Sequence, residues 1–304
     1  MPASPAYTQL GALIRPHPYH LYFLIWILAT VLIGTACSLY YGTHLYSVTL
    51  SALKFTDAAE YQRMAQAAPH GLINRHNWVN QIFVKRAWLW NTLVIAAIGA
   101  TLKRTAGGLR GEHKRTEALS SADLPMRILS SRTLARWAEA TLGWIVFAVW
   151  FFGPSFSQRV SIATGAVCIL GGEQVDVTNC NSRGTGRWSG GHDVSGHTFI
   201  LALGMFLILE TLVPYFPYVL PSFSLLRKSI PYAIYADRDI FRTGQPRTRL
   251  VNVAVFWASV MLVGLWSTML VVTSVYHHYA IEKVTGLLYA IFVWVLMPKE
   301  HALP

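Results

Sequence analysis

The chain has 304 residues, of which 53% are hydrophobic and only 13% are charged. Charged residues make up about a quarter of an ordinary soluble domain, so this chain has too few to cover a soluble surface. The apolar content excludes a disordered chain, and the presence of only three cysteines excludes a disulfide-rich secreted module. The net charge of +11 does not indicate nucleic-acid binding, because the basic residues gather in short segments between apolar runs. The composition indicates a polytopic membrane protein.

Six apolar runs predict an all-α membrane protein with about six transmembrane helices, forming a single transmembrane domain over residues 1–304. A span needs about 20 apolar residues, and the sixth run is short enough to need help from flanking residues. The first run is too long for the core of a signal peptide. The expected spans are approximately 19–40, 80–102, 140–156, 196–215, 251–276 and 281–297.

The connections between these spans predict the orientation. Four prolines interrupt the apolar stretch after the fourth span, so residues 216–250 are expected to form an interfacial segment on the cytosolic side. With the N-terminus in the cytosol, 16 of the 25 Lys and Arg residues lie on the cytosolic side and 9 on the other. Because cytosolic loops carry the excess of basic residues, six spans place both termini in the cytosol.

Two groups of polar residues are expected to meet at one membrane face. Asp193-Val194-Ser195-Gly196-His197 leads into the fourth span, and Tyr276-His277-His278 ends the fifth, so the order of the spans puts both on the lumenal face. Either group alone would most simply be an interface anchor, but the pairing favours a functional site. Ser195 and Gly196 at a helix start offer amide protons to an anion, and glycine allows a ligand to approach closely.

The second group contains a histidine with a carboxylate at helical spacing. His278 and Glu282 are four residues apart, so on a helix they share a face, and the carboxylate can orient the imidazole and stabilise its charged form. His277 would point about 100° away, so His278 is the preferred member. Two histidines beside an anion site suit phosphoryl transfer, with one as nucleophile and the other as general acid.

Further polar residues allow more than one interpretation. Lys85 and Arg86, at the lumenal head of the second span, could neutralise a phosphate or could be snorkelling anchors. Glu210 lies inside the fourth span, about 20 Å along the helix from His197, where a carboxylate marks either function or a packed polar contact. Asn91 in the second span is a candidate partner for Glu210.

The cysteines and the remaining histidines complete the set of reactive side chains. Cys168 and Cys180 share the third loop and could form a disulfide in an oxidising lumen. Cys37 in the first span is more simply interpreted as a packed thiol. A zinc site is conceivable, but the spacing of its possible ligands fits no zinc pattern, so no metal and no other cofactor is expected. Those possible ligands are His192, His197, His277 and His278.

Four sequence blocks, in this order, resemble the fat storage-inducing transmembrane proteins of the endoplasmic reticulum in their fungal form. Each block alone is weakly specific, but the four in order are strongly specific, and they extend over residues 78–286. The blocks are Phe83-Val84-Lys85-Arg86-Ala87-Trp88-Leu89-Trp90, Thr164-Gly165-Ala166-Val167-Cys168, Asp193-Val194-Ser195-Gly196-His197-Thr198-Phe199, and Val275-Tyr276-His277-His278 with Glu282-Lys283.

The resemblance implies an activity and roles for particular residues. The family is similar to lipid phosphate phosphatases, whose central motif also contains Ser-Gly-His, and the resemblance implies an acyl-CoA diphosphatase. Its two catalytic histidines would be His197 as acid and His278 as nucleophile, supported by Asp193 and Glu282. The family usually has an aromatic residue where His277 stands, and the Lys/Arg-rich first motif of the phosphatases has no clear counterpart here.

The same resemblance implies the place and the partners of the protein. It would be a multi-pass protein of the endoplasmic reticulum membrane that meets fatty acyl-CoA and membrane lipids and supports lipid-droplet formation and membrane homeostasis. The alternative is a non-enzymatic protein that binds and partitions neutral lipid, with Glu210 and the proline-broken segment as lipid contacts. Such a binder has no need of two histidines on one face. A transporter is disfavoured, because no paired broken spans are present.

Overall fold

The computed structural model describes residues 17–44, 71–74, 77–112, 123–149, 155–170, 173–175, 187–219, 224–230 and 246–299. These residues are mostly helical, as expected. The long helices are α2 (Pro18–Tyr41), α5 (Ala87–Glu112), α6 (Asp123–Trp144), α9 (Gly196–Leu212), α12 (Pro246–Tyr276) and α13 (Ala280–Leu296). The shorter elements are η1 (Gly71–Ile73), η2 (Asn80–Val84), η3 (Ile145–Val149), α7 (Phe156–Ala163), η4 (Val213–Tyr215), α10 (Phe216–Val219) and α11 (Ser224–Ser229).

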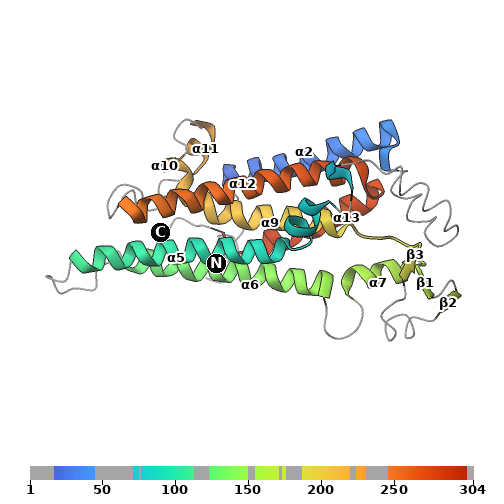
Figure 1. Ribbon diagram of the computed structural model, residues 1–304, viewed down its shortest axis with the longest axis horizontal. Helices are drawn as coiled ribbons and strands as arrows, with labels where there is room; N and C mark the ends of the chain where they lie inside the picture. The colour runs from blue at the N-terminus through green and yellow to red at the C-terminus, as the bar shows by residue number, and fades with distance from the viewer. Residues whose placement is uncertain are drawn as a thin grey trace, which may run out of the picture.

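The long helices run along one common direction and form an elongated bundle (Figure 1). Helices α2 and α12 pack together on one side, α5 and α6 on the other, and α9 lies between them in contact with α2, α5, α6, α12 and α13. The strands and α7 lie at one end of the bundle, whereas α10 and α11 lie toward the other. We refer to these as the sheet end and the α10–α11 end.

Helix α9 is the core of the bundle. Its side chains from Thr198 to Leu212 are buried, with Ile200 the one intermediate position. A helix that is apolar all round is stable only when it is surrounded, and the five neighbouring helices supply those surroundings. The two ends of α9 are therefore held at fixed positions within the bundle.

Among the residues that the structure describes, three helices are long and apolar enough to cross a membrane: Pro18–Tyr41, Gly196–Tyr215 and Arg249–Tyr276. The apolar part of α5, Ala87–Thr101, is shorter. Six spans with both termini in the cytosol remain a proposal. Several helices also extend past the expected boundaries, because α6 begins at Asp123 and α12 begins at Pro246, inside the expected interfacial segment.

A small antiparallel sheet, which the all-α expectation did not include, lies at the sheet end. Its strands are β1 (Val167–Leu170), β2 (Glu173–Val175) and β3 (Arg187–Ser189), in the order β2-β1-β3. Cys168 in the central strand pairs with Val175 on one side and with Trp188 on the other. The side chain of Cys168 is buried and disulfide-bonded, and Cys37 is free. Cys180, the expected partner, lies outside the described residues.

Candidate active site

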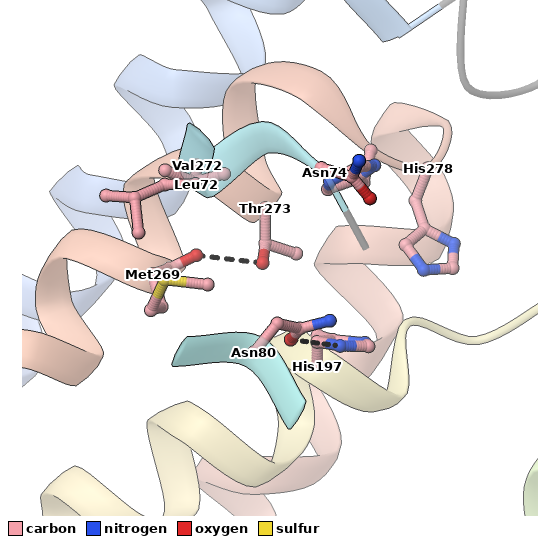
Figure 2. Close-up of a pocket in the computed structure, with 9 residues that line it drawn as sticks. Leu72, Asn74, Asn80, His197, Met269, Val272, Thr273 and His278 are labelled. Atoms are coloured by element: carbon pink, nitrogen blue, oxygen red, sulfur yellow. Dashed lines mark hydrogen bonds between the residues drawn. The ribbon is translucent and has the colours of Figure 1, made fainter. Parts of the chain in front are cut away.

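A pocket near the sheet end brings both candidate histidines together (Figure 2). It is formed by η1, η2, the start of α9, the end of α12 and the bend that follows α12. Its volume of about 70 Å³ is small beside the roughly 300–1,000 Å³ of typical ligand sites. The pocket can therefore hold a phosphate-sized group but not a whole acyl-CoA. The lining residues are Leu72, Asn74, Asn80, His197, Met269, Val272, Thr273, His277 and His278.

His197 is placed by the N-terminal cap of α9. The Ser195 hydroxyl accepts a hydrogen bond from the Thr198 amide at 3.3 Å, which is the usual role of a serine at this position. The Ser195 amide donates to the Glu282 carbonyl oxygen at 3.0 Å, so the cap is also tied to α13. Ser195 is fully buried and its groups serve the fold. Gly196 is exposed in the first turn, where helix amides have no intrahelical acceptor, and its contact with substrate stays a prediction.

His278 lies in the bend between α12 and α13 and has a φ of +60°, a region that non-glycine residues seldom occupy. Its Nδ1 is 3.2 Å from Oε2 of Glu282. The same Oε2 accepts the Tyr279 amide at 3.0 Å, as a glutamate in the first turn commonly does. The exposed Asp193 carboxylate lies 3.9 Å from Nδ1 of His278. The contact expected between His278 and Glu282 is thus present, and it is part of a helix cap.

Lys283 holds the other side of this bend, a role that the sequence reasoning missed. Its ammonium group is buried and donates a hydrogen bond to the Ser274 carbonyl at 2.6 Å. A cation is favourable there because the carbonyls at the end of α12 carry partial negative charge. Glu282 and Lys283 therefore fix the bend from adjacent positions. The charged Glu-Lys pair at the start of an apolar run was the sequence feature that could have indicated this role.

The expectation that His277 points away from the site is wrong. Helix α12 ends at Tyr276, so the helical spacing of 100° per residue no longer applies at residue 277. His277 lines the same pocket as His197 and His278. The preference for His278 therefore rests on its contact with Glu282.

Asn80 is a second residue that the sequence reasoning missed. Its side chain is buried, and its Oδ1 is 3.1 Å from Nε2 of His197 (Figure 2). The two residues are 117 positions apart, so no local pattern joins them. The available signal was a polar residue just before the apolar run of α5.

The structure does not bring the predicted cations to the pocket. Lys85 and Arg86 form the exposed turn between η2 and α5 and are not among the lining residues. Their contact with a phosphate remains a prediction.

Glu210 is fully buried near the far end of α9, away from the pocket lining. Its Oε1 accepts hydrogen bonds from the Trp294 indole at 2.9 Å and the Lys299 ammonium at 3.5 Å, and His20 Nε2 lies at 3.2 Å. The expected pairing with Asn91 is wrong: within the described part of the chain, the Asn91 side chain has no hydrogen-bond partner.

Of the four possible metal ligands, His192 is not among the residues that line the pocket of the other three. Nε2 of His192 is 2.9 Å from the Thr285 hydroxyl, which ties the loop before α9 to α13. Across the described ranges, no group of three or more His, Cys, Asp or Glu side chains could hold a metal ion.

The sequence model of the family described as fat storage-inducing transmembrane protein, FIT, matches residues 68–297. The chain belongs to this family. The matched region contains the whole pocket, both histidines and the Glu282-Lys283 pair.

Several curated relatives are similar over most of their length. The acyl-coenzyme A diphosphatase fit1 of Schizosaccharomyces pombe is 27% identical over 229 residues, which are 74% of this chain and 71% of the relative. The acyl-coenzyme A diphosphatase FITM2 of Caenorhabditis elegans is 24% identical over 82% of this chain and 74% of the relative. The human protein of that name is 25% identical over 73% and 70%. No solved structure matches the chain significantly.

Proposed function

We propose that this FIT protein is an acyl-CoA diphosphatase of the endoplasmic reticulum membrane, with its site on the lumenal face. Water would cleave the pyrophosphate of a fatty acyl-CoA to give acyl 4'-phosphopantetheine and adenosine 3',5'-bisphosphate. The curated relatives are named for this activity. Lipid-droplet formation and membrane homeostasis would depend on this hydrolysis.

The observation that carries the proposal is the meeting of His197 and His278 in one pocket. His197 lies at the start of α9, and His278 lies in the bend after α12. Helices α9 and α12 pack against each other along the bundle. A protein that only binds lipid does not require two histidines at one small pocket. A nucleophile and a general acid do require such proximity.

The contact with Glu282 supports a role for His278 as the nucleophile. When the Nδ1 proton of His278 is donated to the Glu282 carboxylate, Nε2 keeps its lone pair and can act as the nucleophile. Attack on one phosphorus forms an N–P bond and breaks the bridging P–O bond, while His197 gives a proton to the leaving phosphate oxygen. Water then attacks the same phosphorus, the N–P bond breaks, and His197 takes back a proton from the water.

The size of the pocket fits a substrate that stays partly in the membrane. A volume of about 70 Å³ accommodates the reacting phosphate, so the acyl chain and the nucleotide would extend out of the pocket. Leu72, Met269 and Val272 make one wall apolar, which suits a substrate that approaches from the bilayer.

Purified protein incubated with oleoyl-CoA tests the proposal, with the products separated by chromatography and identified by mass. His197→Ala should lower the rate by about 10²–10⁴-fold, the usual contribution of a general acid, and His278→Ala by at least as much. The double variant should be little worse than the poorer single one, because the two residues act as a unit. Size-exclusion profiles would check that the variants fold. Normal cleavage by both single variants would overturn the enzyme proposal.

Binding of neutral lipid is the competing function, and Glu210 was its expected contact. The Glu210 side chain is buried among polar partners from three other segments. Contact with a lipid would require those interactions to open, so this residue does not favour the binding role.

A further inference from the structure

Asn80 makes a contact with His197 that the mechanism above does not use. The side chain of Asn80 is 4% exposed, and its amide oxygen lies 3.1 Å from Nε2 of His197. Figure 2 shows the amide directed at the imidazole within the pocket. A buried hydrogen bond between a neutral side chain and a candidate general acid can control where the acid holds its protons.

The chemistry of an amide oxygen fixes the direction of this bond. An amide oxygen only accepts hydrogen bonds, so Nε2 of His197 must be the donor. In neutral His197 the single ring proton then resides on Nε2. In charged His197 the second proton resides on Nδ1, which becomes the nitrogen from which a proton can be delivered.

The backbone around Asn80 is built to hold it in place. Residues Asn80–Val84 form a π-helical turn, in which the Lys85 amide donates to the Asn80 carbonyl oxygen at 2.9 Å. Such turns often occur at functional sites. The turn is followed by the exposed Lys85-Arg86 corner and then by α5.

Two tryptophans stabilise this turn from different helices. The Trp90 indole, from α5, donates to the Ile82 carbonyl oxygen at 2.8 Å. The fully buried Trp266 indole, from α12, donates to the Phe83 carbonyl oxygen at 3.2 Å. The turn that carries Asn80 is therefore anchored to two elements of the bundle, and its position does not depend on the contact with His197.

We propose that Asn80 is a positioning residue that holds the His197 imidazole with Nε2 protonated, so that His197 delivers its catalytic proton from Nδ1. The inference rests on the proposed role of His197 in hydrolysis. The plain alternative is that Asn80 is a buried amide that only satisfies its own hydrogen-bonding needs. That alternative predicts no effect of Asn80 on the protonation of His197.

Three variants separate these possibilities. Asn80→Leu keeps the approximate size and removes the acceptor, whereas Asn80→Asp keeps the acceptor and adds a charge that favours the imidazolium. Asn91→Leu is the matched control, because Asn91 is equally buried in the same part of the chain but does not contact the pocket. All three should retain the size-exclusion profile of the natural protein.

The first measurement is the pH dependence of oleoyl-CoA hydrolysis. We expect Asn80→Leu to lower kcat by about 10²-fold, the cost of a misplaced catalytic group, with little change in KM. Asn80→Asp should retain more activity and move the alkaline limb of the pH–rate profile upward by about one unit. Asn91→Leu should behave like the natural protein. Equal profiles for Asn80→Leu and the natural protein would overturn the inference.

The second measurement does not need a substrate. Nitrogen NMR of histidine-labelled protein, with the His197 signals assigned by their loss in His197→Gln, reports which ring nitrogen carries the proton. We expect the Nε2-protonated form in the natural protein and in Asn91→Leu, and a mixture in Asn80→Leu. An unchanged ratio in Asn80→Leu would overturn the inference even if the enzyme is active. Absence of hydrolysis by the natural protein, with the ratio dependent on Asn80, would overturn the proposed function and leave the Asn80 contact established.

Discussion

The two adjacent histidines at the end of α12 share a pocket but differ in their partners. Nδ1 of His278 contacts the buried Glu282 carboxylate at 3.2 Å. A carboxylate on one ring nitrogen orients the ring and increases the basicity of the other nitrogen. The contact with Glu282 at the start of α13 therefore supports the proposed role of His278 as nucleophile.

We expect His277→Phe to retain most hydrolytic activity and His278→Ala to lose it. An aromatic ring can fill the lining position of residue 277, whereas no other described side chain takes over the contact of His278 with Glu282. Steady-state hydrolysis of oleoyl-CoA by the two purified variants checks this. The opposite pattern, with an inactive His277→Phe and an active His278→Ala, would move the second catalytic position to residue 277.

The residues that could be predicted from the sequence are those whose contacts are indicated by local spacing or by the order of the membrane spans. The spacing of His278 and Glu282 indicated their contact, and the order of the spans indicated that His197 and His278 would meet. Asn80 had no such signal, because its contact depends on how α9 packs beside the turn before α5. The orientation of His277 was mispredicted because a helix end cannot be located to one residue from an apolar pattern.

At the scale of elements, the site depends on how closely α13 approaches the start of α9. Gly286 is the point of contact: a Cβ built on it would lie 2.5 Å from the Ser195 carbonyl oxygen. That oxygen belongs to the backbone that caps α9, so it cannot move without shifting His197. Close approach of helices at small residues is common in membrane proteins.

We expect Gly286→Ala to lower both stability and activity. Overpacking against backbone typically costs about 1–3 kcal/mol, and the displaced cap should move His197 relative to His278. Gly264→Ala is the matched control, because a Cβ at that position of α12 meets nothing within 4 Å, and alanine is the better helix former. Thermal unfolding in detergent and oleoyl-CoA hydrolysis test both variants. A Gly286→Ala variant as stable and active as Gly264→Ala would show that the crossing can relax.

A buried polar cluster holds the bundle together at the opposite end from the pocket. The cluster consists of Glu210, His20, Arg136, Trp294 and Lys299. Arg136 of α6 donates to the carbonyl oxygens of Pro298 and Glu210 at 2.6 and 3.3 Å. Burial lowers the pKa of Lys299 to about 8, with the Glu210 carboxylate opposing that shift, so at neutral pH the amine is mostly protonated. The cluster joins α2, α6, α9, α13 and the segment after α13.

We expect Glu210→Gln to destabilise the protein while leaving the chemistry intact. Removing one partner of a buried ion pair typically costs about 3–5 kcal/mol, because the other charge remains buried without compensation. Glu139→Gln makes the same change at an exposed position of α6, where the carboxylate interacts with Lys299 from the surface, and should cost no more than about 1 kcal/mol. The thermal midpoint reports the first effect, and hydrolysis well below that midpoint reports the second. Loss of neutral-lipid binding by Glu210→Gln at full stability would instead support a lipid contact.

The elements were predictable where they are long and apolar, and less so at their ends. The cores of α2, α9 and α12 correspond to apolar runs, because only buried or lipid-facing helices tolerate such runs. Helices α6 and α12 begin earlier than expected, since a helix continues past the point where charged residues begin. The sheet was missed because strands of three or four residues leave almost no periodic pattern.

At the scale of the whole molecule, the two ends of the bundle differ in chemistry. The sheet end carries the pocket and the disulfide-bonded Cys168, and disulfides persist in oxidising compartments such as the lumen of the endoplasmic reticulum. The α10–α11 end carries Arg227 and Lys228 in α11, and basic residues gather on the cytosolic side. Two independent features thus support the same orientation.

We therefore expect the segments near Arg183 and His278 to be lumenal and those near Arg110 and Arg242 to be cytosolic; residues 183 and 242 lie outside the described residues. Epitope tags placed near each position, one per variant, can be tested by protease treatment of sealed microsomes. Tags near residues 183 and 278 should be protected until detergent is added, and tags near 110 and 242 should be digested at once. Variants that still cleave oleoyl-CoA show that the tag has not disturbed the fold. A protected tag near Arg110 in such a variant would invert the topology and place the His197–His278 pocket in the cytosol, where the reaction would draw on cytosolic rather than lumenal acyl-CoA.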